Sequence, residues 1–377
     1  MGIKELSIFL SANFFSPETE WYSYRVVTAF VYREKVNYTQ ETSTKHAALE
    51  GTPFVSSLIA GELDVDTVRQ KVEPVYYQEI KKEVLSSTNL VQAIENLELK
   101  RSTVQTVKNL LSFGEDVNGT TMSGETALHR AIEKGNEEVA QLLIEHGADI
   151  NIQDTLKRTP LFLASAKGNV PITRLLLSKG ADSTLSNEYD QTAFTIALEN
   201  GHNKIISLFL GQRRGISKEK LHKSLIIASA KGHSEIVKLL LSAGAYSNTR
   251  TVLEKTPLHK VALYGHYEIA SLLLVHGSAV NAIDSTQHTP LHYAAQKGYY
   301  DIVKLLIRYN AALDQQSYDG KTALHYAAQE GNAKIVKLLL KRGAQAAIKD
   351  WNGRTALDLA LLHHRATVQT LLTVYIS

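Results

Sequence analysis

The feature that most constrains this chain is a short stretch that recurs with a fixed 33-residue period. It is a threonine, then proline or alanine, then leucine or phenylalanine, and in most copies a histidine. The stretch begins at Thr126, Thr159, Thr192, Thr256, Thr289 and Thr322. A fixed period of this length predicts a stack of similar supersecondary units, each burying its apolar face against its neighbours. It argues against a globular enzyme core.

Each repeat carries the residues that begin and end two helices. Threonine is a favoured N-cap, and proline suits the first helical turn because its missing N–H costs nothing there. A glycine follows nine residues after the threonine, and glycine favours the left-handed conformation that ends a helix. These glycines are Gly135, Gly168, Gly201, Gly265, Gly298 and Gly331. A second helix is then predicted by apolar residues at helical spacing, such as Ile302, Leu305 and Leu306.

Together, the Thr-Pro-Leu-His stretch, the Gly-Asn or Gly-His after the first helix and the Gly-Ala-Asp-Ile-Asn at 147–151 resemble the ankyrin repeat family. The resemblance covers roughly residues 86–377. It implies an all-α solenoid in which each unit is a helix-turn-helix followed by a hairpin loop. It also implies that the partner is a protein, contacted by the hairpin tips and by the two residues before the first-helix glycine.

Two units depart from the period. The step from Gly201 to Gly232 is two short of the period, and Lys223-Ser224-Leu225 stands where the threonine stretch belongs. We expect a helix cap there and a remodelled hairpin. The last unit has His364 in place of the glycine, and terminal repeats are usually atypical. With both units included, residues 123–377 are predicted to form an array of about eight units.

Residues 51–122 are predicted to hold degenerate ankyrin-like units. The step from Thr88 to Thr126 is five longer than the period, so we place an insertion near Leu97–Thr103. Thr52, with Gly61 nine residues later, repeats the pattern without a closing glycine. The sequence leaves open whether that stretch is a true repeat.

Residues 1–50 form a separate, aromatic-rich segment. Twelve of the chain's 28 aromatic residues lie in residues 1–85, together with 9 Lys/Arg and 12 Asp/Glu. Ser16-Pro17 favours a helix start, whereas Val26, Val27 and nearby aromatic residues favour strands. We expect a helical segment that packs on the first unit and caps the array.

Composition removes several classes of function. The chain has no cysteine, which excludes disulfides, a thiolate nucleophile and a Cys-based zinc site, and which suits a reducing cytosol. Its net charge of +3 is low for a dedicated nucleic-acid binder. No apolar run approaches the roughly 18 residues that span a bilayer, and the first residues lack the pattern of a signal peptide. We expect a cytoplasmic, monomeric protein with no membrane span and no nucleic-acid ligand.

The fourteen histidines could suggest a metal site or a general base, but nine of them occupy repeated positions. In the threonine stretch we expect the ring to hydrogen-bond to the backbone of a neighbouring hairpin. The histidines of that stretch are His129, His259, His292 and His325. The chain has no Gly-x-Ser-x-Gly, Walker or kinase motif. We expect no metal site, no cofactor and no catalytic residue.

The partner-binding residues are expected at hairpin tips and just before the first-helix glycines. They are Arg158, Tyr189, Lys255, His288, Tyr318, Lys321, Trp351 and Arg354 in the hairpins, and Leu263, Tyr264 and Lys297 before the glycines. Aromatic and arginine side chains dominate binding energy when they are exposed, so Tyr264, Tyr318, Trp351 and Arg354 rank highest. In the alternative interpretation, Trp351 packs on its own hairpin and Tyr264 on the adjacent helix.

A basic cluster falls at the irregular junction of the fourth unit, with Glu219 as its only acidic neighbour. It consists of Arg213, Arg214, Lys218, Lys220 and Lys223. The cluster is either a solvated turn or a docking point for an acidic segment or a phosphate.

These observations favour a non-catalytic protein–protein interaction scaffold that binds a partner protein through its concave face and hairpin tips. One alternative is a bacterial effector that uses ankyrin repeats inside a host cell, which would place it in the host cytosol. The other is an enzyme whose active part lies in the N-terminal segment.

Overall fold

The computed structural model describes residues 53–71, 74–96, 101–212 and 216–376. Regular structure in these ranges is helical, apart from one isolated bridge between Thr120 and Thr126. The predicted all-α fold class is therefore confirmed for this part of the chain. The expectations for residues 1–50, Thr52, Arg213 and Arg214 lie outside the described residues.

The chain divides into two compact units, residues 1–190 and 191–377. Among the described residues of the first unit, three helices precede the regular pairs: α4 (Pro53–Ile59), α5 (Val65–Lys71) and α6 (Pro74–Ser87). Its helix pairs are α7 (Leu90–Asn96) with α8 (Arg101–Ser112), α9 (Ala127–Lys134) with α10 (Glu137–Glu145), and α11 (Pro160–Lys167) with α12 (Val170–Ser178).

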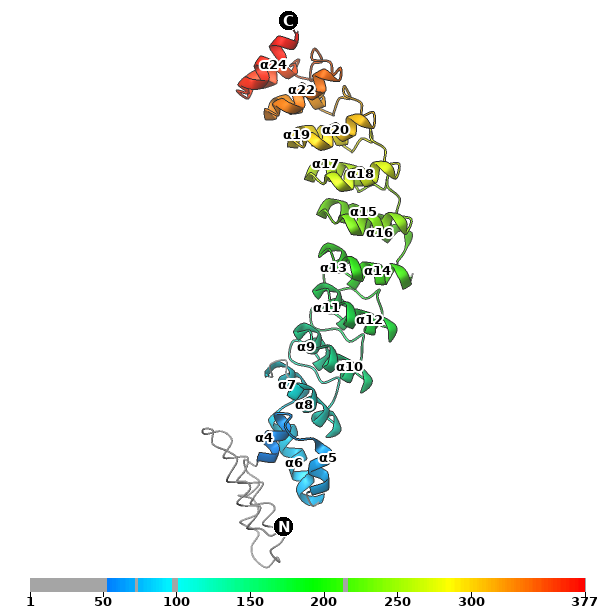
Figure 1. Cartoon of the computed structure of the whole chain (residues 1–377), viewed down its shortest axis with the longest axis vertical. Helices are drawn as coiled ribbons and strands as arrows, with labels where there is room; N and C mark the ends of the chain where they lie inside the picture. The colour runs from blue at the N-terminus through cyan, green and yellow to red at the C-terminus, as the bar shows by residue number, and fades with distance from the viewer. Residues whose placement is uncertain (1–52, 72–73, 97–100, 213–215, 377) are drawn as a thin grey trace, which may run out of the picture. The chain divides into compact units, whose positions relative to one another are not determined.

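The second unit is built of helix pairs throughout its described residues (Figure 1). They are α13 (Ala193–Glu199) with α14 (Asn203–Gln212), α15 (Lys218–Lys231) with α16 (Ser234–Ser242), α17 (Pro257–Tyr264) with α18 (Tyr267–Val275), α19 (Pro290–Lys297) with α20 (Tyr300–Arg308), α21 (Ala323–Glu330) with α22 (Ala333–Lys341), and α23 (Ala356–Leu362) with α24 (Ala366–Ile376).

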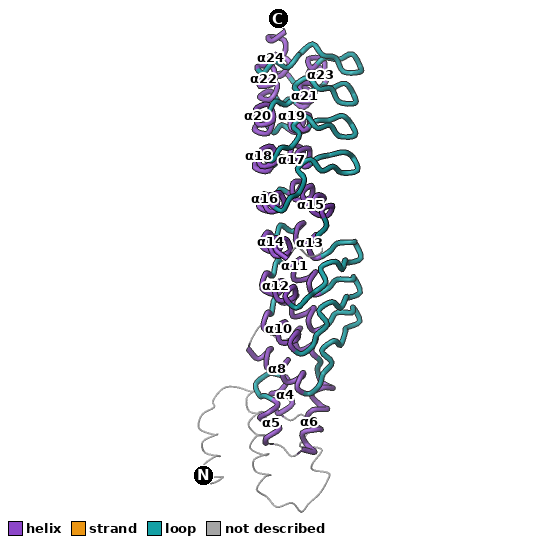
Figure 2. Tube along the Cα trace, turned by 90° about the vertical axis from the view of Figure 1, so that its right-hand side faces the viewer, coloured by secondary structure: helices purple, strands orange, loops and turns teal. Residues whose placement is uncertain are grey.

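Within each unit the regular helix pairs form two packed rows. The first helix of a pair packs on the first helix of the next, as α19 does on α21, and second helices pack likewise, as α20 does on α22. Buried leucines and isoleucines at the predicted spacing fill the space between rows, and each is worth roughly 1.5–3 kcal/mol when fully buried. Ile302, Leu306 and Leu339 are examples, each at most 1% exposed. The connections between pairs project as hairpins from one side of the helices (Figure 2).

Helices α4 and α5 occupy the stretch around Gly61 that the sequence left open as a repeat, with Gly61 at a positive φ between them. Their packing differs from that of the regular pairs, because α4 lies against α8 and α6. The buried side chain of Asn109 on α8 donates to the carbonyls of Leu58 (3.0 Å) and Leu63 (2.7 Å). The predicted insertion near Leu97–Thr103 falls partly on residues 97–100, which lie outside the described chain.

The predicted helix cap at Lys223-Ser224-Leu225 is wrong. Helix α15 begins at Lys218, where the Ser217 hydroxyl accepts a hydrogen bond from the Lys220 backbone N–H (3.1 Å). Serine satisfies a free N–H at a helix start, whereas lysine has no acceptor to offer. Almost two additional helical turns therefore replace the hairpin, because only residues 213–217 separate α15 from Gln212 at the end of α14.

The turn between the two helices of a pair requires a residue in the left-handed conformation. Gly331 has φ 84° there, and His364 takes the equivalent place in the last pair with φ 55°. A residue with a Cβ atom is strained by about 1–2 kcal/mol in this conformation.

Replacing His364 by glycine should therefore raise the free energy of unfolding by roughly 0.5–1 kcal/mol, because glycine relieves the strain but loses more freedom on folding. Urea unfolding followed by circular dichroism measures the change. The matched control is the neighbouring exposed His363, which has φ −99°. His363→Gly should lower stability, and an equal effect of the two substitutions would contradict the assignment of strain to His364.

Candidate partner-binding surface

Successive hairpin tips are joined by backbone hydrogen bonds. In the first unit Thr155 N–H donates to Ser123 O (3.0 Å) and Glu188 N–H to Leu156 O (3.1 Å). The second unit repeats this bond three times: Ser285 N–H to Leu253 O (3.2 Å), Tyr318 N–H to Thr286 O (3.0 Å) and Trp351 N–H to Asp319 O (3.2 Å). The tips of each unit therefore form a continuous row, seen as the projecting loops in Figure 2.

Large apolar side chains stand exposed along these rows. Of the predicted residues, Tyr189, Tyr318 and Trp351 are 72%, 74% and 71% exposed. The indole N–H of Trp351 donates to Tyr318 O (2.7 Å), so this side chain packs on the preceding hairpin while one face stays open. Gly320 permits this packing, since a Cβ atom there would lie 2.7 Å from the Trp351 backbone nitrogen.

Two exposed tip residues were missed, Met122 and Leu253. Val252 also stands almost fully exposed at its tip. Met122 and Val252 occupy the same repeat position as Tyr318 and Trp351, four residues before the threonine. Comparing the repeats position by position would have found Met122, and also Leu253, which stands three residues before its threonine as Tyr189 does.

Arg158 is a member of an internal ion-pair network and does not stand free. Its guanidinium contacts the carboxylates of Asp154 (2.6 Å) and Glu125 (3.1 Å). Glu125, whose side chain is only 8% exposed, also pairs with Arg130 (2.7 Å). Arg130 in turn contacts Glu133 and Glu95, both at 3.1 Å. The network joins neighbouring repeats of the first unit.

Lys255, His288 and Lys321 likewise lie in a cluster of bonded side chains in the second unit. The His288 ring stacks on Tyr293, with centroids 5.2 Å apart, and its Nε2 lies 2.9 Å from the Tyr326 hydroxyl. Lys255 and Lys321 cover the faces of the two tyrosine rings at 4.8 and 5.5 Å.

Carboxylates complete this cluster. The Tyr293 hydroxyl donates to Asp284 (2.6 Å) and that of Tyr326 to Asp319 (2.9 Å). Burial, and then hydrogen bonding to the carboxylate, raises the pKa of Tyr293 well above its usual value. The pKa of Asp319 is lowered to about 2 because bonds from Ser317, Tyr326 and Lys321 outweigh its desolvation. Each charged or polar group therefore already has a partner within the array.

The remaining predicted residues differ in exposure. The Arg354 guanidinium forms an ion pair with the Asp350 carboxylate, with Nη2 3.0 Å from it. Tyr264 is half exposed, and its ring lies 6.4 Å from that of His266. Lys297 is exposed and Leu263 is partly buried.

The basic cluster is only partly available at the surface of the described residues. Lys218 and Lys223 are exposed, and Lys223 pairs with Glu219 at 2.6 Å. Lys220 points inward, donating to the Thr192 hydroxyl (2.9 Å) and covering the ring of Phe194 at 5.6 Å. Burial lowers the pKa of Lys220.

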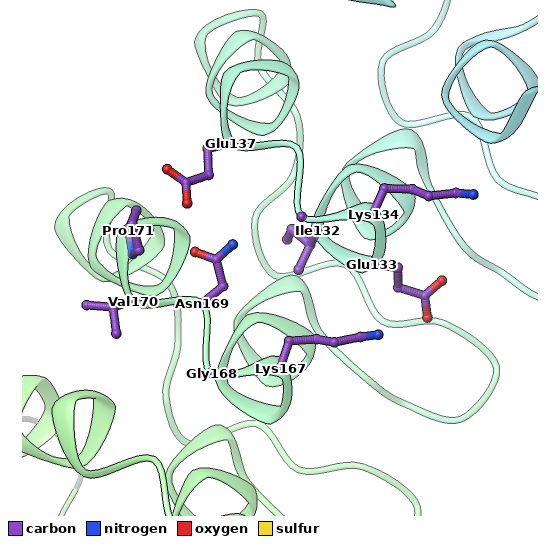
Figure 3. Close-up of a pocket in the computed structure, with 10 residues that line it drawn as sticks. Ile132, Glu133, Lys134, Glu137, Lys167, Gly168, Asn169, Val170 and Pro171 are labelled. Atoms are coloured by element: carbon purple, nitrogen blue, oxygen red, sulfur yellow. The ribbon is translucent and has the colours of Figure 1, made fainter. Parts of the chain in front are cut away.

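A shallow hollow of about 460 Å³ lies where α9 and α11 end and α10 and α12 begin. Figure 3 shows Glu133, Lys134 and Lys167 projecting to one side of it and Glu137 standing on the other. The predicted contact positions before the first-helix glycines therefore border a depression. Its charges are of both signs, so the hollow favours no single class of small ligand.

The repeated histidines join neighbouring repeats, as predicted. The backbone N–H of Thr126 donates to His129 Nδ1 (3.1 Å), which makes Nδ1 an acceptor and leaves the proton on Nε2. Nε2 then donates to Arg158 O (3.1 Å) in the next hairpin. His259, His292 and His325 repeat the arrangement, with Nε2 2.9, 2.9 and 3.1 Å from a hairpin carbonyl.

Burial lowers the pKa of these rings because a charged imidazolium is poorly solvated there. The pKa values of His259 and His292 fall to about 4, and those of His129 and His325 are also lowered. A neutral ring suits the geometry, since protonation of Nδ1 would remove the acceptor for the threonine N–H.

The described residues contain neither a cluster of metal-binding side chains nor a helix that could span a membrane. In these ranges, no three histidine, aspartate or glutamate side chains come together in a way that could hold a metal ion. Among the helices that the structure describes, none is both long and apolar enough to cross a membrane.

Comparison with protein-family models gives matches along most of the chain. A model described as ankyrin repeats in three copies matches residues 224–317 and 309–377. A second, described as ankyrin repeats in many copies, matches residues 93–144, 128–177 and 161–210. A search of curated proteins gave no match.

The buried histidines predict a loss of stability in mild acid. The pKa of histidine is near 6.5 in the unfolded chain, whereas the pKa values of His259 and His292 in the folded chain are about 4. The two neutral rings therefore stabilise the folded chain fully above pH 6.5, and this contribution is lost as the pH falls towards 4. At pH 5 the free energy of unfolding should be lower by roughly 1–2 kcal/mol for each ring. Urea unfolding at several pH values measures this change.

The double variant His259→Asn, His292→Asn should be less stable at pH 7.5 and should lose less stability between pH 7 and pH 5. His363→Asn, at an exposed position, is the control. An unchanged pH dependence in the double variant would show that these two rings are not the groups responsible.

Proposed function

The chain belongs to the ankyrin repeat family, and on that premise we propose that it is a non-catalytic scaffold that captures a partner protein on its hairpin tips and concave face. Ankyrin repeats generally mediate protein–protein interaction. The proposal adds the surface used and the side chains that bind. The proposed place of action is the cytoplasm, and the proposed form is a monomer.

The observation that carries the proposal is the exposure of aromatic and aliphatic side chains at most of the hairpin tips, including the adjacent tips of Tyr318 and Trp351. Single exposed apolar residues are ordinary on protein surfaces, whereas a contiguous row indicates an interaction site. In the second unit Val252, Tyr318 and Trp351 share one repeat position and are each more than 70% exposed. Tyr318 and Trp351 lie on adjacent tips, whereas Ser285 holds this position on the tip between Val252 and Tyr318. Tyrosine and tryptophan are the residues that most often dominate binding energy.

The charged residues near the tips were expected to bind the partner, but their contacts favour a different role. Arg158 and Lys321 bond to carboxylates of their own array, so a partner would gain little from them without breaking existing pairs. They fix the hairpins in place, and the exposed apolar side chains then provide the contacts. A partner with an apolar surface that crosses several repeats fits this arrangement.

The absence of a catalytic role is also a proposal, and the titratable clusters support it. The most strongly shifted groups, His259, His292, Tyr293 and Tyr326, all bond to other groups of the array. Structural networks of bonded side chains shift pKa values as functional sites do. These groups are explained by the stacking of repeats.

Replacing Tyr318 and Trp351 together by alanine tests the proposal. Helical content should remain unchanged, because both side chains are more than 70% exposed. Partner affinity should fall by about tenfold or more, since each exposed aromatic anchor typically contributes over 1 kcal/mol. The measurement is quantitative affinity capture with the full chain, followed by titration of the captured protein.

The matched control is Tyr267→Ala with Tyr300→Ala, which removes two exposed aromatic rings from second helices. Proteins lost with the tip variant but retained with this control bind the tips. Equal retention by both variants would refute the hairpin-tip proposal.

A further inference from the structure

A second candidate surface lies on the second helices of the last repeats, away from the hairpins. A groove of about 460 Å³ separates α22 from α24. Its lining is mostly apolar, with Leu340, Leu371, Val374 and Tyr375 between Lys337 and Lys341. The Tyr375 hydroxyl donates to Leu340 O (3.0 Å), which fixes one end of the groove.

The apolar surface here is larger than the groove alone. Val374 is 72% exposed, Tyr375 52% and Ile376 54%. At the same repeat position as Val374, the neighbouring second helices carry Lys341 and Arg308. This repeat position is therefore basic on α20 and α22 and apolar on α24.

The flank of the groove is strongly basic. Six exposed cations lie on α20, on α22 and just after it: Lys304, Arg308, Lys334, Lys337, Lys341 and Arg342. Helices α20, α22 and α24 together carry one carboxylate, Asp301. Within the described residues none of the six cations forms an ion pair, unlike Arg158, Lys255, Lys321 and Arg354 in the hairpins.

The distribution of charge along the whole chain also favours an acidic partner for the second unit. Residues 191–377 contain 22 Lys/Arg and 12 Asp/Glu, whereas residues 1–190 contain 19 and 26. The second unit is thus the basic half of a chain whose total charge is only +3. Such a field attracts acidic partners and speeds their association.

We propose that the groove between α22 and α24 binds an acidic amphipathic segment of a partner protein. Apolar side chains of the segment enter the groove against Leu371 and Val374, and its carboxylates meet Lys337 and Lys341. An apolar face laid in a groove with charges at its rim is a recurring mode of peptide recognition. This surface is separate from the hairpin tips, so it adds a second interaction to the proposed function.

The shape of the surface favours a peptide over a lipid bilayer. Interfacial membrane binding uses apolar side chains that protrude into the headgroup region. Here Leu340 is only 4% exposed and Leu371 is partly buried, so these two side chains form the floor of a concavity that the more exposed Val374 and Tyr375 also line. A concavity accepts side chains from a partner and offers a flat bilayer little contact.

The test uses the full chain and synthetic peptides long enough for about five helical turns, read by fluorescence anisotropy. The first peptide has leucine at helical spacing and glutamate elsewhere. One comparison peptide replaces glutamate by lysine, and the other replaces leucine by serine. Saturable binding of the first peptide, at least about tenfold tighter than of either comparison, is expected.

Two variants then locate the binding. Lys337→Glu with Lys341→Glu should weaken it about tenfold, and Val374→Asp should weaken it about fivefold. The controls are Lys204→Glu with Lys231→Glu, at exposed positions elsewhere, and Val275→Asp. Val275 occupies the repeat position of Val374 and is 69% exposed against 72%. Both controls should bind as the unaltered chain does.

The proposal is overturned if the peptides bind alike, if the acidic peptide does not bind, or if the control variants lose as much affinity as the groove variants. Vesicles of phosphatidylcholine with phosphatidylserine form the last arm. Capture of the chain by these vesicles through Lys337 and Lys341, without preference for the acidic peptide, would assign the surface to a membrane instead. The variant Trp351→Ala, Tyr318→Ala should still bind the peptide, so this proposal and the hairpin-tip proposal fail independently.

Discussion

A neutral, buried histidine links one repeat to the next wherever the Thr-x-Leu-His stretch is complete. Its Nδ1 accepts the N–H at the start of its own helix, and its Nε2 donates to a carbonyl of the following hairpin. Thr126 and His129 are at most 1% exposed, so the threonine N–H and the ring N–H are both buried, and an unpaired buried polar group costs about 1–3 kcal/mol. Each repeat therefore depends on its neighbour for hydrogen bonding as well as for apolar burial.

Repeats that lack the histidine keep only part of this link. In the repeat that begins at Thr192, the hydroxyl of Thr195 accepts the threonine N–H (2.7 Å) but is too short to reach the next repeat. The inter-repeat bond is supplied from the other side, by Lys220 donating to the Thr192 hydroxyl. The long helix α15 places this lysine, which explains why a residue of the basic cluster lies inside the structure.

The 33-residue period was sufficient to predict the helix pairs, because threonine caps and left-handed glycines act locally. The start of α15 was missed because Ser217 caps it outside the register, and no repeated position pointed there. The tip residues were only partly predictable. Exposure of Tyr318 and Trp351 followed from their place in the repeat, whereas the engagement of Arg158 depends on Glu125, one full repeat away.

That pairing illustrates a general limit of single-repeat reasoning. Whether a polar side chain is free or bonded depends on the side chains that the stack brings beside it, and these belong to the preceding or the following repeat. The groove beside α24 was not foreseen for a related reason. Sequence position identifies second-helix residues, but the depth between two such helices depends on how their side chains pack.

The bonds between successive tips have a thermodynamic consequence for recognition. Loops that are free before binding must be ordered by their partner, and that loss of conformational entropy subtracts from affinity. Here the backbone N–H groups of Ser285, Tyr318 and Trp351 are already bonded to the preceding tip. Most of the ordering occurs when the chain folds, so contacts made by the exposed side chains translate more fully into affinity. The same backbone framework can therefore carry different tip residues, and so different specificities, without a new entropic penalty.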